Sequence, residues 1–216
     1  MMRPERVQSL GEEIANSVTH GVAALASAAA IPFLILAALP GGVPSIVGSA
    51  VFGASLVLLY VSSTIYHSLA RNRAKRVFRV IDHSAIYVLI AGTYTPFTLG
   101  VLRGVWGWTL FGVVWALGAA GIALTASLGI RFPKASTAVY IGMGWLIVVA
   151  IKPLLQHLPA AGLAWLVAGG LCYTGGAAIY GWARPRYQHA IWHLFVLAGS
   201  ACHWIAVAGY AAPRLA

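Results

Sequence analysis

Two histidines, His189 and His193, lie four residues apart in the last apolar segment of a chain that carries few charges. In a helix, residues four apart are about 6 Å apart along one face, close enough for both imidazoles to bind one metal ion. Ionisable side chains are costly inside a membrane, and those found there usually have a function. The pair therefore predicts a functional site, provided that the apolar segments span a membrane.

Three imidazoles and an open fourth position are typical of a catalytic zinc site. The third imidazole is predicted to be that of His67, so the expected ligands of Zn²⁺ are His67, His189 and His193. This pair lacks the glutamate found in the helical motif of soluble metalloproteases, so the base must lie elsewhere. We predict that Asp82, the only acid expected near or within a span, orients or deprotonates a water there. Ser63, one turn from His67, could bind the developing oxyanion or support a ligand.

Each assignment has a simpler alternative. The histidine pair could start a helix facing the lipid headgroups, and His67 could merely end a helix before a basic loop. Asp82 could pair with Arg79 or cap its helix, where negative charge is favourable. Ser63 could bond the carbonyl four residues earlier, as serines in spans often do.

Several further polar residues share faces with the predicted site. His203 lies roughly 21 Å along the helix from His189, too deep for the same metal, and is expected to hydrogen-bond inside the bundle. His83 points about 100° away from Asp82 and is not expected to be a ligand. The residues Glu13, Asn16 and His20 recur at one helical face, and they could line the mouth of the site, buttress it or satisfy the start of a helix.

The helices that must hold these residues are predicted from composition. Hydrophobic residues make up 60% of the 216 residues, charged residues make up 8%, and the mean hydropathy is +0.84. Long uncharged runs are typical of spanning helices of about 20 residues. We predict an all-α integral membrane protein, a seven-transmembrane helix bundle that forms a single membrane domain over residues 1–216. A short cytoplasmic segment (1–16) precedes spans at 17–39, 45–67, 81–102, 106–127, 136–155, 162–182 and 189–213.

The basic residues predict the orientation of these spans. With a cytoplasmic N-terminus, the inner side holds eleven of the 14 Lys and Arg residues and the outer side holds Arg103, Lys152 and Arg214. This asymmetry predicts the N-terminus inside and the C-terminus outside. His67, Asp82 and the histidine pair then all fall near the cytoplasmic end. The net charge of +10 is thereby explained without nucleic acid, and the loop between Arg71 and Arg79 is expected to lie against anionic headgroups.

Four sequence motifs resemble those of bacterial hemolysin III-type proteins, which belong with the progestin and adipoQ receptors and, more distantly, with alkaline ceramidases. The motifs are Glu12-Glu13-Ile14-Ala15-Asn16-Ser17-Val18-Thr19-His20-Gly21, Ser63-x3-His67, Asp82 with Ala91-Gly92-Thr93-Tyr94-Thr95-Pro96, and His189-x3-His193. The resemblance covers nearly the whole chain. It implies seven helices, a cytoplasmic N-terminus and a zinc ion held by the three histidines, with Asp82 and Ser63 beside it. It also implies a multi-pass protein of the bacterial inner (plasma) membrane.

Two classes of function follow from these expectations. The first is a zinc-dependent hydrolase that acts on an amide or ester of a membrane lipid, as the resemblance to ceramidases implies. The second is a non-catalytic protein, either membrane-perturbing or a receptor-like sensor, in which zinc is structural. A retinal-type pump is disfavoured because the last predicted span has no lysine and the spans lack a relay of carboxylates. The sequence gives no oligomeric state.

Overall fold

The computed structural model describes residues 7–182 and 185–212, in which the regular structure is entirely helical. The long helices are α1 (Leu10–Ala38), α2 (Gly42–Ser68), α3 (Arg73–Leu99), α4 (Val105–Leu128), α7 (Ala160–Trp182) and α8 (Gln188–Ala206). Shorter elements are η1 (Leu39–Gly41), α5 (Pro133–Trp145), η2 (Leu146–Ala150), α6 (Ile151–His157) and the π-helical turns of η3 (Val207–Ala211).

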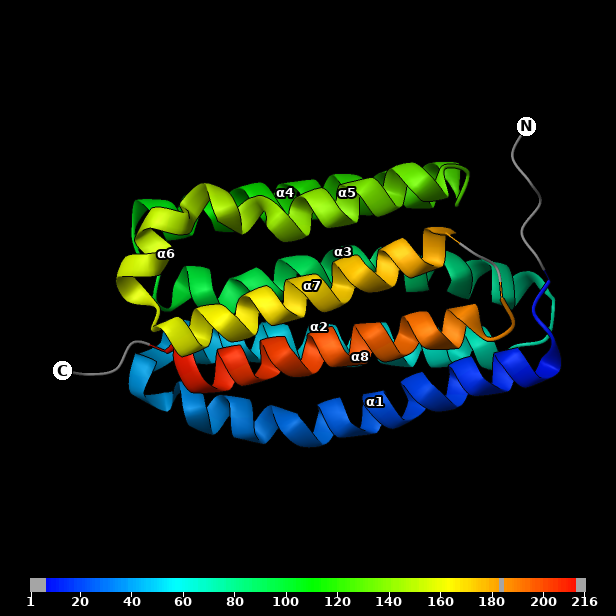
Figure 1. The fold of residues 1–216 in the computed structure, drawn as a ribbon, viewed down its shortest axis with the longest axis horizontal. Coiled ribbons are helices and arrows are strands. Elements are labelled where there is room, and N and C mark those ends of the chain that lie inside the picture. The colour runs from blue at the N-terminus through cyan, green and yellow to red at the C-terminus, as the bar shows by residue number, and fades with distance from the viewer. Residues whose placement is uncertain (1–6, 183–184, 213–216) are drawn as a thin grey trace.

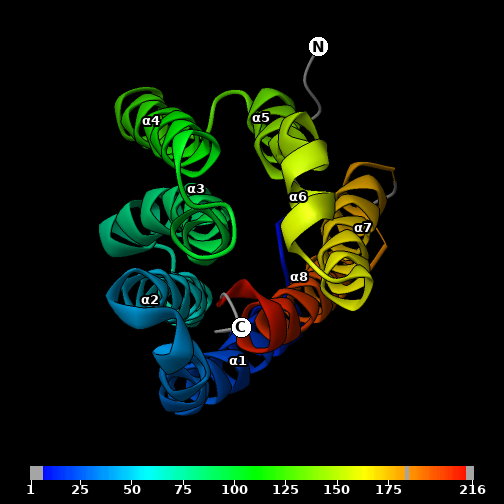
Figure 2. The ribbon, with the colours of Figure 1, turned by 90° about the vertical axis from the view of Figure 1, so that its left-hand side faces the viewer.

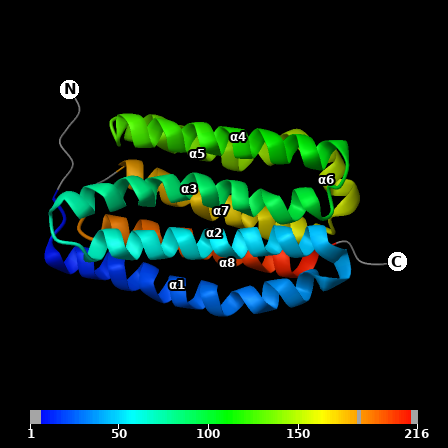
Figure 3. The same cartoon turned by 180° about the vertical axis from the view of Figure 1, so that it is seen from behind.

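The long helices run side by side along one axis, and α1 begins at the opposite end of the bundle from η3 (Figure 1). From behind, α2 and α3 lie between α1 and α4 (Figure 3). Seen from one end, the helices follow one another around a ring, and α8 lies between α7 and α1 (Figure 2). The most extensive contacts join α1 to α2, α2 to α3 and α7 to α8, and α8 also packs against α1. The last helix is thus brought against the first.

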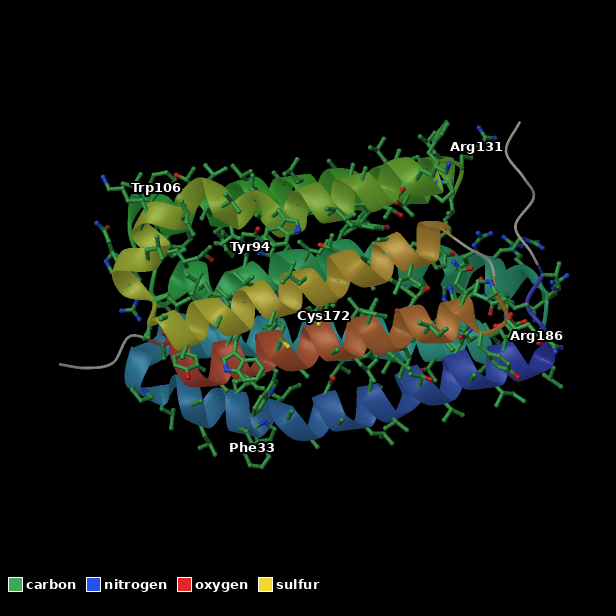
Figure 4. The ribbon with its side chains drawn as sticks, viewed as in Figure 1. Phe33, Tyr94, Trp106, Arg131, Cys172 and Arg186 are labelled. Atoms are coloured by element: carbon green, nitrogen blue, oxygen red, sulfur yellow. The ribbon has the colours of Figure 1, made fainter. Side chains whose placement is uncertain are left out.

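Five helical stretches in the described ranges are long and apolar enough to cross a membrane: Leu10–Ser68, Val105–Leu128, Pro133–His157, Ala160–Gly181 and Gln188–Ala211. The first stretch contains both α1 and α2. Large apolar side chains cover its outer surface: Phe33, for example, is 62% exposed and points away from the other helices (Figure 4). The expected class, an all-α integral membrane protein, agrees with these observations.

The helix α3 is not among the five stretches, although it is as long as α2. Its hydropathy is lowered by the basic residues of its first turns and by polar residues that face the interior of the bundle: Asp82 is buried, as is the unbroken run from Ala91 to Thr98. A Cβ on Gly48 of α2 would lie 2.7 Å from Pro96 Cα, so the two helices touch backbone to backbone there. Neighbouring helices thus shield the polar side of α3 from lipid.

The first helix begins seven residues earlier than the predicted span, at Leu10 rather than at residue 17. A reciprocal capping box sets this start: the Glu12 backbone N–H donates to Ser9 Oγ (3.4 Å), and the Ser9 N–H donates to the Glu12 carboxylate (2.9 Å). Residues 10–16, predicted to precede the first span, therefore belong to α1. Glu12 and Asn16 are buried in the structure.

Candidate metal centre

Three histidines from two helices meet near the end of the bundle where α1 begins. His67 lies in the last turn of α2, and His189 and His193 lie in the first turns of α8. Just before α8, Tyr187 has a left-handed backbone (φ 60°), and its N–H donates to the buried Glu12 carboxylate (2.9 Å). The start of α1 thereby fixes the start of the helix that carries the histidine pair.

The three imidazoles form one compact group. Their ring centroids are 4.9 Å apart for His67 and His189, 5.3 Å for His67 and His193, and 4.7 Å for His189 and His193. One nitrogen of each ring lies within 4.8 Å of the other two. In a tetrahedral zinc site, ligand nitrogens are separated by about 3.3 Å, as follows from Zn–N distances near 2.05 Å. Small side-chain movements bring the group to this spacing, and the three residues fit a divalent metal.

The hydrogen bonding of the rings points the same way. His67 Nε2, His189 Nδ1 and His193 Nδ1 are buried and have no hydrogen-bond partner among the described residues. Each unmet polar group inside a protein costs about 1–3 kcal/mol. One cation that accepts the lone pairs of all three nitrogens would remove this cost for each of them. Three imidazole nitrogens suit zinc and would leave its fourth coordination position open.

A second group orients His67 from its other side. Glu13 of α1 lies 2.7 Å from His67 Nδ1, and Lys75 Nζ of α3 donates to the other carboxylate oxygen of Glu13 (2.9 Å). We infer from this network that Nδ1 carries the proton and donates it to Glu13, which leaves the lone pair on Nε2. Histidine ligands of metals commonly have such a carboxylate partner, which fixes the tautomer and the orientation of the ring.

Glu13 corrects one sequence-based expectation. Asp82 was predicted to be the only acidic residue near a span, because Glu13 precedes the first apolar run. The prediction is wrong because the capping box starts α1 early and places Glu13 beside His67. The helical spacing of Glu13, Asn16 and His20 was the sequence signal that could have revealed this contact.

Replacing Glu13 by glutamine is expected to weaken zinc affinity about 10- to 100-fold, the usual effect of losing such a partner. Glutamine keeps the shape of the side chain but removes the charge that holds the His67 proton. The measurement is competitive zinc titration of the purified protein. The matched control is Lys75→Met, which removes the ion pair with Glu13 and leaves the Glu13–His67 contact; its affinity should change far less. Equal affinities of wild type and Glu13→Gln would contradict the assigned role.

Asp82 and Ser63 lie against each other, and Ser63 precedes His67 by one turn of α2. Asp82 is 7% exposed on α3, and its carboxyl faces the hydroxyl of Ser63 on α2. Ser63 Oγ forms no regular hydrogen bond to the described residues, so it does not bond the carbonyl four residues earlier. Asp82 does not cap its helix either, because α3 begins at Arg73 and Asn72 caps it. Asp82 is not part of the three-histidine group, and its carboxylate lies 3.6 Å from His83 Nδ1.

Other predicted positions stay outside the centre. His83 Nδ1 contacts the Arg79 carbonyl (3.0 Å) and is not part of the histidine group. His203 Nε2 contacts the Leu166 carbonyl (3.2 Å), so its expected hydrogen bond inside the bundle is confirmed. Cys172 and Cys202 form no disulfide among the described residues, and Cys172 lies halfway along the bundle (Figure 4).

A cleft of about 310 Å³ reaches the outer side of the centre. It is lined by Gln8, Leu10, Glu13, His67, Ser68, Leu69, Ala70, Arg71 and Lys75. A smaller cleft of about 170 Å³ shares Glu13 and His67 and continues along the apolar residues Leu10, Ile14 and Val18 of α1. The partner of His67 is therefore accessible from the surface at this end of the bundle.

The fold and the site together define a helical membrane protein with a three-histidine group that could hold a metal ion. A family model described as "Haemolysin-III related" matches residues 8–204, and the chain belongs to this family. It is 48% identical over 207 residues to "Hemolysin-3" of Bacillus cereus, which covers 95% of this chain and 94% of that protein. It is also 48% identical to the "Hemolysin-3 homolog" of Bacillus subtilis (strain 168), over 94% of this chain and 95% of that protein.

A more distant relative is found in animals. The human "Monocyte to macrophage differentiation factor" is 26% identical over 194 residues, or 78% of this chain and 79% of that protein. The resemblance inferred from the four motifs is thus confirmed at the level of the family.

Proposed function

We propose that this protein is a zinc-dependent hydrolase that cleaves an amide or ester bond of a membrane lipid. One observation carries the proposal: the three grouped imidazoles bring ligand atoms within 4.8 Å of one another, each has a buried nitrogen without a partner among the described residues, and the buried Asp82 carboxylate on α3 is not one of their group. A purely structural site usually has four protein ligands, whereas a catalytic site has three and keeps one position open.

The chemistry divides between the metal and the chain. Bound zinc supplies a Lewis acid that polarises a carbonyl and makes water more acidic. His67, His189 and His193 would hold the ion, and Glu13 would keep the His67 ring in its binding orientation. The Asp82 carboxylate would accept the proton of the attacking water and return it to the leaving amine or alcohol. The Ser63 hydroxyl, which has no regular partner, would donate to the oxygen on which negative charge develops.

A lipid is the expected substrate because of where the site lies. The centre is near one end of a bundle whose outer surface is apolar, which would put it at the depth where lipid headgroups join their acyl chains. The two clefts beside His67 together offer apolar residues of α1 and the basic residues Arg71 and Lys75. This combination suits a molecule with a polar head and an apolar tail. The names of the bacterial relatives refer to haemolysis and specify no reaction.

The proposal includes seven crossings by one membrane domain, with the N-terminus in the cytoplasm and the C-terminus outside. It is supported by the opposite positions of the start of α1 and the end of η3. Arg131 and Arg186 lie at the end where α1 begins, whereas Trp106 lies at the other end (Figure 4). Arg71, Arg73 and Arg76 are exposed, and in this topology they would face anionic headgroups of a bacterial inner membrane. Reporters fused to the two termini should respond on opposite sides; a response on the same side would contradict this topology.

The test of the activity is incubation of the purified, zinc-loaded protein with a bacterial lipid extract and with a ceramide. Mass spectrometry should detect a free fatty acid and the matching amine or alcohol, and a chelator should stop their release. Stable zinc binding without release from any lipid would contradict the proposal and favour a structural metal in a membrane-perturbing or sensor protein.

A further inference from the structure

The imidazole of His20 lies at the metal centre and has no role in the mechanism above. The residue is 3% exposed, and both ring nitrogens are buried without a hydrogen-bond partner among the described residues. A neutral imidazole has one donor and one acceptor, and burial without partners is costly for both. The ring is therefore placed to bind a polar group that does not belong to the described part of the chain.

Two aromatic contacts fix the ring in this position. His20 is stacked on His193 with a centroid distance of 3.4 Å and an angle of 7° between the rings. Tyr60 packs edge-on against it at 5.0 Å and is itself held by a hydrogen bond from its hydroxyl to Ser200 Oγ (2.7 Å). His20 is thus locked in place over a predicted ligand.

The stacking geometry separates His20 from the ligands themselves. His193 would hold a metal through a lone pair of its ring, and this lone pair lies in the plane of the ring. The His20 ring occupies a parallel plane 3.4 Å away, and His20 is not one of the three grouped histidines. While stacked, His20 would lie too far from that metal to bind it, so the ring is beside the three grouped histidines rather than one of their ligands.

A purely structural role does not account for both nitrogens. An apolar ring would stack on His193 equally well and would avoid the cost of burying two polar atoms. His203 provides the contrast within the same bundle, because its Nε2 has a backbone partner in the Leu166 carbonyl at 3.2 Å. His20 has no such partner.

We propose that His20 hydrogen-bonds the oxygen ligand that occupies the fourth position of the metal, whether it comes from water or from the carbonyl of the lipid. The inference rests on the proposed function, because it requires a metal with an open position. It adds an imidazole from α1, which already supplies Glu13 behind His67, to a centre that also draws on α2, α3 and α8. His20 would then contribute to binding an oxygen ligand and would contribute little to binding the metal.

The test uses the full-length protein loaded with Co²⁺, whose visible absorption reports both metal binding and the ligand in the fourth position. Acetohydroxamate, which binds metals through oxygen, is titrated into wild type, His20→Phe and His203→Phe. Phenylalanine keeps an aromatic ring for stacking but has no ring nitrogens. His20→Phe should bind Co²⁺ within about threefold of wild type and acetohydroxamate at least about tenfold more weakly, a loss equal to one hydrogen bond. His203→Phe should match wild type for both.

Each other outcome overturns the inference in a recognisable way. Unchanged acetohydroxamate affinity in His20→Phe would show that His20 does not contact the ligand. Loss of the metal from His20→Phe would make His20 a ligand or a structural support of the site. If the phenylalanine variant does not fold, the smaller His20→Leu serves for the same comparison. A wild-type protein that binds no metal would defeat the proposed function itself, before any variant is compared.

Discussion

Replacing His193 by alanine is expected to remove the metal from the protein. Wild type should contain about one zinc ion per chain, and His193→Ala should contain close to none after dialysis. Loss of a carboxylate behind a ligand typically costs 10- to 100-fold in affinity, so loss of the ligand itself should cost more than about 100-fold. The measurement is elemental analysis of the purified protein, followed by competitive zinc titration.

His193 is the most informative ligand to remove. It is 1% exposed, and its ring contacts those of His20, His67 and His189. Without it only two imidazoles remain, and nothing else in the grouped set replaces it. His203→Ala, which removes a half-buried histidine of α8, is the control and should remain loaded. A fully loaded His193→Ala protein would rule out the three-histidine centre.

Replacing Asp82 by asparagine is expected to abolish most of the hydrolysis without removing the metal. A general base contributes about 10²- to 10⁴-fold to a rate, and asparagine cannot accept the proton. The buried position of Asp82 beside Ser63, and its absence from the histidine group, are the reasons to expect this separation. The rate of fatty acid release and the zinc content are measured on the same preparation.

The conservative variant Asp82→Glu keeps a carboxylate and should retain more activity than Asp82→Asn. Unchanged hydrolysis in Asp82→Asn would show that this carboxylate does not act in the reaction. Loss of zinc together with activity would instead make Asp82 a support of the metal site.

The histidine group could be predicted from sequence because two simple rules place its members. The distribution of Lys and Arg sets which helix ends share a side, and the spacing of His189 and His193 places both rings on one face. The contact of Glu13 with His67 could not be predicted in the same way. Hydropathy locates an apolar run but gives neither the true start of α1 nor its rotation relative to α2. The local signal was the spacing of Ser9 and Glu12, which forms the capping box.

Mean hydropathy also fails to identify α3 as a helix that could span the membrane. The threonines and Tyr94 in its second half lower its mean hydropathy, yet they lie in the centre of the bundle, where Tyr94 Oη donates to the Met143 carbonyl (2.8 Å). An average over the sequence cannot separate inward from outward faces. Only the packing of α2 and α4 against α3 shows which residues are shielded from lipid.

The contact between the first and last helices has a consequence for biosynthesis. Ribosomes complete α1 and α2 long before α8, and nascent proteins usually fold from the N-terminus onwards. His67 and Glu13 therefore enter the bilayer well before His189 and His193 exist. The three histidines could therefore bind a metal only after synthesis of α8. A bound ion would then link α2 to α8. Truncation before residue 189 would leave a newly made protein unable to mature by this route.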